Sequence, residues 1–370
     1  MIEKGRISLW QFFTLITGYT IGTSTLIVPV GPARQDAWIA YLLAGTLGLG
    51  AAYFYTALAR RFPRETPIQY APRVLGWWLG NLCNLIFLWY ALHLAALVLR
   101  NVIELYKLVI LPHTPALLIA GIFAGLAAYA ISIGVEIPAR LSELLIPFAL
   151  AAILILTFLA FSVPGLVHWE ALLPVMERGL LPVLRGAYPA FVFPFGETVF
   201  FLLIMPFLIE PRKSFVPFTL AVSTSTLLTT LVLVRNLIIL GVSESAQINF
   251  PSLTAIEMIN IGEFLQRMEP VIIFVWSFTI LIKLIVVYYA FTLGMAQLFG
   301  LKDYRPLVLP AGLLLTFLSL SLYENFTQML IFAARVFPFY FVPACLLYPA
   351  LLLLVAKIRN IKGRARLKDV

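Results

Sequence analysis

Long apolar runs separated by short polar segments make up almost the whole chain. A transmembrane helix needs about 20 consecutive apolar residues, and roughly ten runs meet that length. The runs lie at 9–30, 37–59, 79–110, 114–134, 140–162, 182–209, 214–241, 269–299, 305–322 and 326–357. This pattern predicts an all-α integral membrane protein with about ten transmembrane helices.

The polar segments between these runs are short. Residues 67–78 form a brief amphipathic stretch that we expect to lie on the membrane surface. The longest connections are 163–181 and 242–268, and Pro251-Ser252 in the second predicts the start of a short helix. No polar stretch reaches the size of a soluble domain, so any function must reside in the transmembrane bundle and its loops.

Composition and charge support this picture. The chain is 62% hydrophobic and 12% charged, with a mean hydropathy of +0.98, whereas soluble domains carry about 25% charged residues. The net charge of +9 does not indicate nucleic-acid binding, because the basic residues are scattered over short loops and the C-terminal segment. With the N-terminus inside, the inner segments hold 17 Lys and Arg residues and the outer segments 5. The positive-inside rule therefore predicts cytoplasmic N- and C-termini, and the basic tail at 357–368 is a topology anchor or a contact for anionic lipid.

Nothing in the sequence indicates an enzyme or a cofactor. Cys83 and Cys345 lie inside apolar runs, without the spacing of a metal site or a disulfide framework, and we interpret them as packing residues. We find no nucleophile–base constellation, phosphate-binding loop or metal-ligand cluster. We therefore expect no enzymatic activity, no cofactor and no metal.

The first run is interrupted near its middle by residues 17–24, TGYTIGTS. Unwound backbone at membrane depth is tolerated where it lines a cavity or is buried in protein. We expect a broken helix here that places Gly18, Gly22, Thr23 and Ser24 at the ligand site, with free N–H groups at the last three forming a receptor for a ligand carboxylate. The alternative is that Gly18 and Gly22 only permit close helix packing.

A second interruption, FPFGE at 193–197, lies in the sixth run. Proline removes a backbone hydrogen bond and glycine loosens the helix. The first and sixth runs occupy corresponding places in two halves of five helices, and paired interruptions of this kind indicate a transporter-type binding site. We expect Pro194, Phe195, Gly196 and Glu197 to line that site, with a helix cap as the alternative role of Glu197.

Lys283 lies in the middle of the eighth run, where a buried charge is costly unless it is paired or solvated. Helical spacing puts it on one face with Glu269, Trp276 and Thr279. We therefore expect Lys283 and Thr279 to face the bundle interior as candidate ligand contacts, with Lys283 near Glu197 or the pocket. The alternative is that Lys283 reaches along its own helix to the cytoplasmic surface.

Polar residues also form one stripe on the third run. Arg100 and Glu104 are four residues apart and can pair. Their place near the outer end favours a structural charge pair, although a ligand contact is the alternative. His93 lies deeper, and we include it among the candidate ligand contacts, as a pH-sensitive group or else an ordinary interior residue. The two breaks and the two polar stripes together predict a pocket formed by the first, third, sixth and eighth helices.

Several short motifs, in this order and at these spacings, resemble the B subunits of endospore germinant receptors, a branch of the amino acid–polyamine–organocation transporter superfamily. Two features depart from that family. Ser24 stands where many relatives have Gly, and Val98 stands where some carry an acid, so a ligand role for an acid there does not carry over. The motifs are ISLWQFF at 7–13, IGTSTL at 21–26, DAWI at 36–39, RFP at 61–63, FGE at 195–197 and QRME at 266–269, followed by Trp276 and Lys283.

The resemblance implies a fold of the leucine-transporter type, with two inverted repeats of five helices and broken helices 1 and 6. Within one transmembrane domain over 1–370, the first repeat would span 9–162 and the second 182–322. The tenth helix and a basic cytoplasmic tail would occupy 326–370. The resemblance also implies a small nutrient germinant, usually an amino acid, and A and C partner subunits in the spore's inner membrane.

Three functions remain open at this stage. The first is a germinant-sensing receptor subunit, in which ligand binding shifts a transporter-like equilibrium that partner subunits read. The second is a proton- or sodium-coupled amino-acid transporter in a cell membrane, and the third is a channel-forming component. Genes for A and C partners beside this one would favour the receptor.

Overall fold

The bundle is helical along almost its whole described length. The computed structural model describes residues 3, 5–259 and 268–363, and the candidate motif residues Gln266 and Arg267 and most of the basic tail lie outside them. The helices of the first half are α1 Leu9–Ser24, α2 Ala37–Arg61, α3 Pro67–Leu75, α4 Trp77–Leu105, α5 Ala116–Ile133 and α6 Glu136–Ser162. Short 3₁₀ or π segments are η1 Gly31–Asp36, η2 Tyr106–Ile110 and η3 Trp169–Leu172.

The second half contains more interruptions. Its α-helices are α7 Leu180–Ala190, α8 Phe215–Gln247, α9 Pro251–Glu257, α10 Glu269–Leu298, α11 Arg305–Ser321, α12 Phe326–Arg335, α13 Phe337–Val342 and α14 Tyr348–Ile358. Its 3₁₀ or π segments are η4 Phe191–Phe195, η5 Gly196–Leu203, η6 Met205–Phe207, η7 Pro211–Lys213 and η8 Pro343–Leu347. The short helices predicted on the surface at 67–78 and after Pro251 are present as α3 and α9.

All ten predicted apolar runs correspond to helices, but not all of them are long single helices. Within the described residues, 8 helices are long and apolar enough to cross a membrane, or up to 9 if the bent pair α11 and α12 is one span. α1 has only 16 residues because the chain leaves the helix after Ser24. The predicted last run is divided into α12, α13, η8 and α14, and α12 is bent by 99° from α11.

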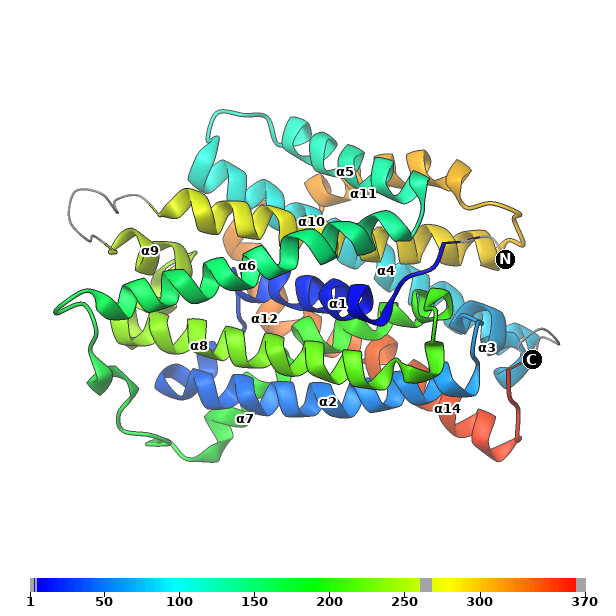
Figure 1. Ribbon diagram of the computed structural model, residues 1–370, viewed down its shortest axis with the longest axis horizontal. Coiled ribbons are helices and arrows are strands. Elements are labelled where there is room, and N and C mark those ends of the chain that lie inside the picture. Colours follow the sequence, from blue (N-terminus) through cyan, green and yellow to red (C-terminus); the bar gives the residue numbers. More distant parts are fainter. Residues whose placement is uncertain (1–2, 4, 260–267, 364–370) are drawn as a thin grey trace.

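α1 is the central helix of the bundle. It packs against α6, α8 and α10 and lies between them in Figure 1. Every residue from Thr14 to Ser24 is buried. A capping box starts the helix: the Ser8 hydroxyl accepts from the Gln11 amide at 3.1 Å, and the Gln11 side chain accepts from the Ser8 amide at 2.9 Å.

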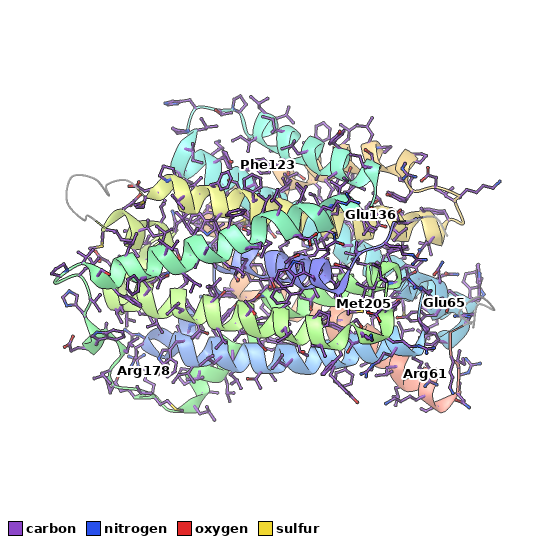
Figure 2. All side chains as sticks on the ribbon, viewed as in Figure 1. Arg61, Glu65, Phe123, Glu136, Arg178 and Met205 are labelled. Atoms are coloured by element: carbon purple, nitrogen blue, oxygen red, sulfur yellow. The ribbon has the colours of Figure 1, made fainter. Side chains whose placement is uncertain are left out.

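The described N- and C-terminal segments meet the bundle at one end, near the end of α2. The backbone of Ile7 bonds to Phe207 and Ile209, and Arg61 donates to the carbonyl of Ile361 at 2.7 Å. Arg61 and Glu65 lie at this end in Figure 2, whereas Arg178 lies at the opposite end. The shared end agrees with an even number of membrane crossings.

Candidate functional site

The end of α1 differs from the predicted break. The helix is continuous through Gly18 and Gly22 to Ser24. The next amides are all hydrogen-bonded, from Thr25 to Ile21 O at 3.3 Å, from Leu26 to Thr23 O at 3.2 Å and from Ile27 to Thr23 O at 2.9 Å. The predicted carboxylate receptor at Gly22, Thr23 and Ser24 is therefore wrong as placed, because a helix C-terminus carries carbonyls and partial negative charge.

The two glycines of α1 lie at close helix contacts, as the packing alternative predicted. A Cβ on Gly22 would lie 2.6 Å from the backbone oxygen of Thr279 in α10. A Cβ on Gly18 would lie 2.5 Å from the end of the Ile146 side chain in α6. Glycine at these positions allows α1 to pack directly against its neighbours.

The predicted interruption of the sixth run is confirmed. Phe193, inside η4, has the non-helical angles φ −119° and ψ 112°, so the helical run that begins with α7 is broken there and η5 starts at Gly196. Glu197 lies in the first turn of η5 and is fully buried. The acid is therefore placed at the N-terminal end of a helical segment, where a negative charge is favoured.

A buried ion pair joins this break to the eighth run. Lys283 Nζ lies 2.5 Å from Glu197 Oε2 and donates to Thr23 Oγ1 at 2.7 Å. The ammonium also lies 4.4 Å from the centre of the Phe193 ring, within range of a cation–π contact. Lys283 thus faces the interior beside Glu197, as predicted, and a ligand-binding role for either residue stays a prediction.

Two tyrosines that the sequence analysis missed hold the broken segment. Tyr19 of α1 donates to the backbone carbonyl of Glu197 at 3.0 Å. Tyr55 of α2 contacts the carbonyl of Gly196 at 3.2 Å and that of Cys345 in η8 at 2.7 Å. Both hydroxyls satisfy carbonyls that the break frees from regular helix bonding, but tyrosines in apolar runs carry no pattern that would predict this use.

A small cavity of about 40 Å³ lies beside Glu197. The cavity is lined by the segment that follows α1, by α4, by the sixth-run break and by α12 and α13. α10, the eighth predicted helix, does not line this cavity; the last run takes that place, and Lys283 of α10 lies behind Glu197. A ligand pocket formed by the first, third, sixth and eighth helices stays a prediction. The lining residues are Ile27, Pro29, Leu94, Leu97, Val98, Asn101, Phe193, Glu197, Met329, Leu330, Phe332, Ala333 and Phe337.

The cavity is apolar except for Glu197 and Asn101. One Glu197 carboxylate oxygen, Oε1, has no hydrogen-bond partner among the described residues. A volume of this size holds about one water, whereas pockets for small molecules usually measure about 300–1,000 Å³. At this centre the structure is therefore closed to a ligand of that size.

His93 and Thr279 surround the centre without lining the cavity. The His93 ring lies against Phe332 at 5.7 Å and Tyr340 at 5.3 Å, and its Nδ1 atom has no partner among the described residues. Thr279 donates back to the carbonyl of Val275 at 2.8 Å. Direct ligand contacts by these two residues stay predictions.

Arg100 and Glu104 form the expected pair on α4. Arg100 Nη2 lies 2.6 Å from Glu104 Oε1, and Nη1 contacts the carbonyls of Ser319 at 3.4 Å and Leu320 at 3.5 Å. Both charged side chains are buried. The pair therefore ties α4 to the last turn of α11.

Replacing Arg100 with leucine should destabilise the bundle by about 3–5 kcal/mol, because Glu104 would be left buried without a cation. The measurement is the thermal unfolding midpoint of the purified protein. Arg140→Leu is the matched control, since Arg140 pairs with Glu136 at 3.2 Å in an exposed i,i+4 arrangement worth at most about 1 kcal/mol. Equal shifts for the two variants would contradict a structural role for the buried pair.

The fold and this centre define a class of protein: a polytopic helical membrane protein with a buried ion pair at a broken helix. The structure aligns with the crystal structure of MhsT in complex with L-phenylalanine, with a TM-score of 0.64, covering 93% of this chain and 97% of that one at 12% sequence identity. At that identity the likeness shows the fold alone, which is the leucine-transporter type that the sequence analysis expected.

Sequence comparison then gives the family. Residues 6–329 match the family model described as "Spore germination protein". Spore germination protein KB of Bacillus subtilis is 32% identical over 359 residues, which cover 96% of this chain and 95% of the relative. Spore germination protein YndE of the same organism is 29% identical, covering 84% of this chain and 85% of the relative. This chain belongs to the spore germination protein family.

Proposed function

We propose that this chain is the germinant-sensing membrane subunit of a spore germination receptor. A small nutrient, of which an amino acid is the best candidate, would bind beside Glu197 and Lys283 at the sixth-run break. Binding would shift the bundle between conformations that partner A and C subunits read, with both termini on the cytoplasmic side of the spore's inner membrane. The observation that carries the proposal is the buried Glu197–Lys283 pair at a helix break next to a closed cavity.

The chemistry of this centre supports an amino acid as the ligand. A zwitterion offers an ammonium group to the Glu197 carboxylate and a carboxylate to the Lys283 ammonium, so it can replace the internal pair without leaving a buried charge uncompensated. The apolar walls from α4, α12 and α13 would contact the side chain of such a ligand. A neutral sugar could not replace the Glu197–Lys283 ion pair and could only form hydrogen bonds to it.

The closed state supports sensing through a conformational change. The bend between α11 and α12 lies just before the run that covers the cavity, and the π segment η8 interrupts that run. Such interruptions let a short element move while the long helices stay in place. A ligand that binds only the opened state shifts the population toward it.

The test fills the cavity from α12. Ala333 lines the cavity, whereas its neighbour Ala334 is exposed. We expect Ala333→Trp to reduce amino-acid binding by the purified protein at least 10-fold, because the indole occupies the site, and Ala334→Trp to bind like the wild type. Binding is measured by calorimetry across a panel of amino acids and sugars. Equal binding by the two variants would place the ligand elsewhere.

Coupled transport is the second candidate, since the fold is shared with transporters. Uptake of the bound amino acid into proteoliposomes under a proton or sodium gradient separates the two functions. A receptor subunit binds the ligand without accumulating it. Accumulation driven by either gradient would replace the receptor proposal with that of a transporter.

A further inference from the structure

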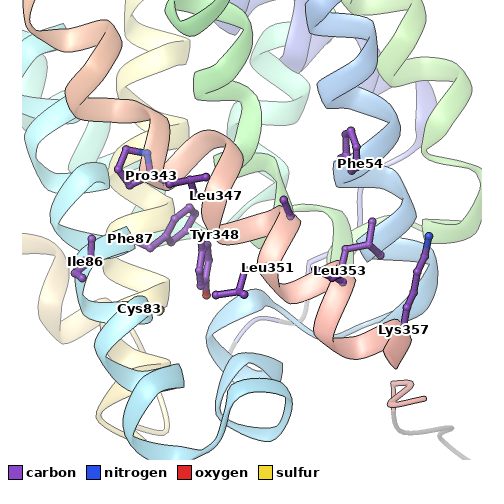
Figure 3. A pocket seen from close by; sticks show the side chains of 13 residues that line it. Phe54, Cys83, Ile86, Phe87, Pro343, Leu347, Tyr348, Leu351, Leu353 and Lys357 are labelled. Carbon is purple, nitrogen blue, oxygen red and sulfur yellow. The ribbon is translucent and has the colours of Figure 1, made fainter. Parts of the chain in front are cut away.

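A second, larger hollow lies on the outer surface of the bundle, away from the Glu197 centre. It is a groove of about 650 Å³ along η8 and α14, bordered by α4 on one side and by Phe54 of α2 on the other, as Figure 3 shows. Its walls are apolar side chains such as Ile86, Phe87, Leu347 and Leu351. One charged side chain, Lys357, lines it at the end of α14.

The groove is long enough to extend through one leaflet. From Pro343 to Lys357 the wall is almost continuously helical, and at about 1.5 Å per residue this stretch measures roughly 20 Å. Half of a hydrocarbon core about 30 Å thick is about 15 Å. Its Lys357 end therefore reaches the headgroup level.

Neighbouring residues agree with that depth. Arg359 donates to the carbonyl of Val74 in α3 at 2.8 Å, so α14 ends against the amphipathic surface helix. The next helix starts with Trp77 and Trp78, which are 63% and 81% exposed. Tryptophan side chains concentrate at the membrane–water interface.

We propose that this groove binds an anionic phospholipid of the leaflet on the side of the described termini. One acyl chain would lie along η8 and α14 in this groove, and the phosphate would pair with Lys357 at its end. The groove is lined by apolar side chains except at its Lys357 end. A flexible acyl chain can fill it, and the single cation at its headgroup end favours a negative lipid.

The wall of this groove also supports the helix break at the ligand centre. Ala344 lines the groove, and the next residue, Cys345, lies 3.2 Å (Sγ) from where a Cβ on Gly196 would be. The Tyr55 hydroxyl joins the carbonyls of Gly196 and Cys345. A bound lipid would therefore brace η8 from outside and, through it, the segment that carries Glu197. This coupling rests on the proposed function, but the lipid site itself does not.

Lipid retention tests the site directly. The purified protein is placed in nanodiscs or detergent with phosphatidylglycerol or phosphatidylcholine, and retained lipid is counted by native mass spectrometry. We expect one retained phosphatidylglycerol, and we expect Ala350→Trp to lose it because the indole fills the groove that Ala350 lines. Ala151→Trp is the matched control, since Ala151 is exposed on the outer face of α6.

Charge removal is the second variant, and it leaves the apolar walls intact. Lys357→Gln should lower the preference for phosphatidylglycerol over phosphatidylcholine about fivefold. Lys302→Gln, an exposed lysine in the loop before α11, should leave it unchanged. Equal retention by Ala350→Trp and Ala151→Trp, or equal effects of the two lysine variants, would overturn the lipid site.

The coupling between the lipid groove and the Glu197 centre is tested by measuring amino-acid affinity in phosphatidylglycerol and in phosphatidylcholine. We expect wild-type affinity to be higher in phosphatidylglycerol, with the difference lost in Ala350→Trp. Unchanged affinity with specific lipid retention would overturn the coupling and keep the lipid site. Specific lipid retention in a protein that binds no amino acid would overturn the proposed function and not the lipid site.

Discussion

Replacing Lys283 with alanine will abolish ligand binding and destabilise the protein by about 3–5 kcal/mol. Its ammonium compensates a Glu197 carboxylate that is fully buried. Removing one partner of such a pair leaves the other charge without a counter-ion in a low-dielectric interior. Thr23 also loses its donor. The measurements are the thermal unfolding midpoint and amino-acid binding by calorimetry, both on purified protein.

Two further variants separate charge from packing. Lys283→Arg should restore stability only in part, because the planar guanidinium is larger than the ammonium and has a different hydration. The double variant Glu197→Gln with Lys283→Met removes both charges and should recover most of the stability. Binding should stay lost in the double variant, because the polar groups that would receive a zwitterion are gone. Wild-type binding by Lys283→Ala or by the double variant would refute the placement of the ligand at this pair.

Replacing Gly22 with leucine should abolish binding while the protein stays in the membrane. Any Cβ at this position would lie 2.6 Å from the Thr279 backbone oxygen and 2.8 Å from its carbonyl carbon. Backbone atoms cannot rotate away, so α1 must move from α10, and Thr23 must move from Lys283 with it. Overpacking of this kind costs about 1–3 kcal/mol or more, and even Gly22→Ala should show part of the loss.

Matched variants show whether the effect comes from this contact. Gly125 lies in α5 with no atom within 4 Å of an added Cβ, so Gly125→Ala should be neutral or stabilise by up to about 1 kcal/mol through helix propensity. Ser24→Ala removes one hydroxyl that donates to Thr20 O at 2.7 Å and should cost on the order of 1 kcal/mol. Equal effects of Gly22→Ala and Gly125→Ala on stability and binding would show that the contact with α10 is unimportant.

The sequence determined the class of protein and much of its arrangement. The bilayer requires helices of fixed minimal length, so the apolar runs alone located the helices to within a few residues. Pro194 and Gly196 predicted the interruption at Phe193, because proline cannot continue the helix hydrogen bonding. The cost of a buried ammonium predicted that Lys283 would face the interior near an acid, and the structure confirms its pairing with Glu197.

Only the tertiary structure decided what lies around that pair. Glycine in a helix is compatible with unwinding and with close packing, and the contact of Gly22 with Thr279 in α10, some 250 residues away, is what selects packing. The cavity wall from α12 and α13 and the hydroxyls of Tyr19 and Tyr55 likewise depend on contacts between distant segments. A hydrophobic pattern reports which residues avoid water, but it does not report which apolar faces meet, because lipid and protein neighbours satisfy the same pattern equally well.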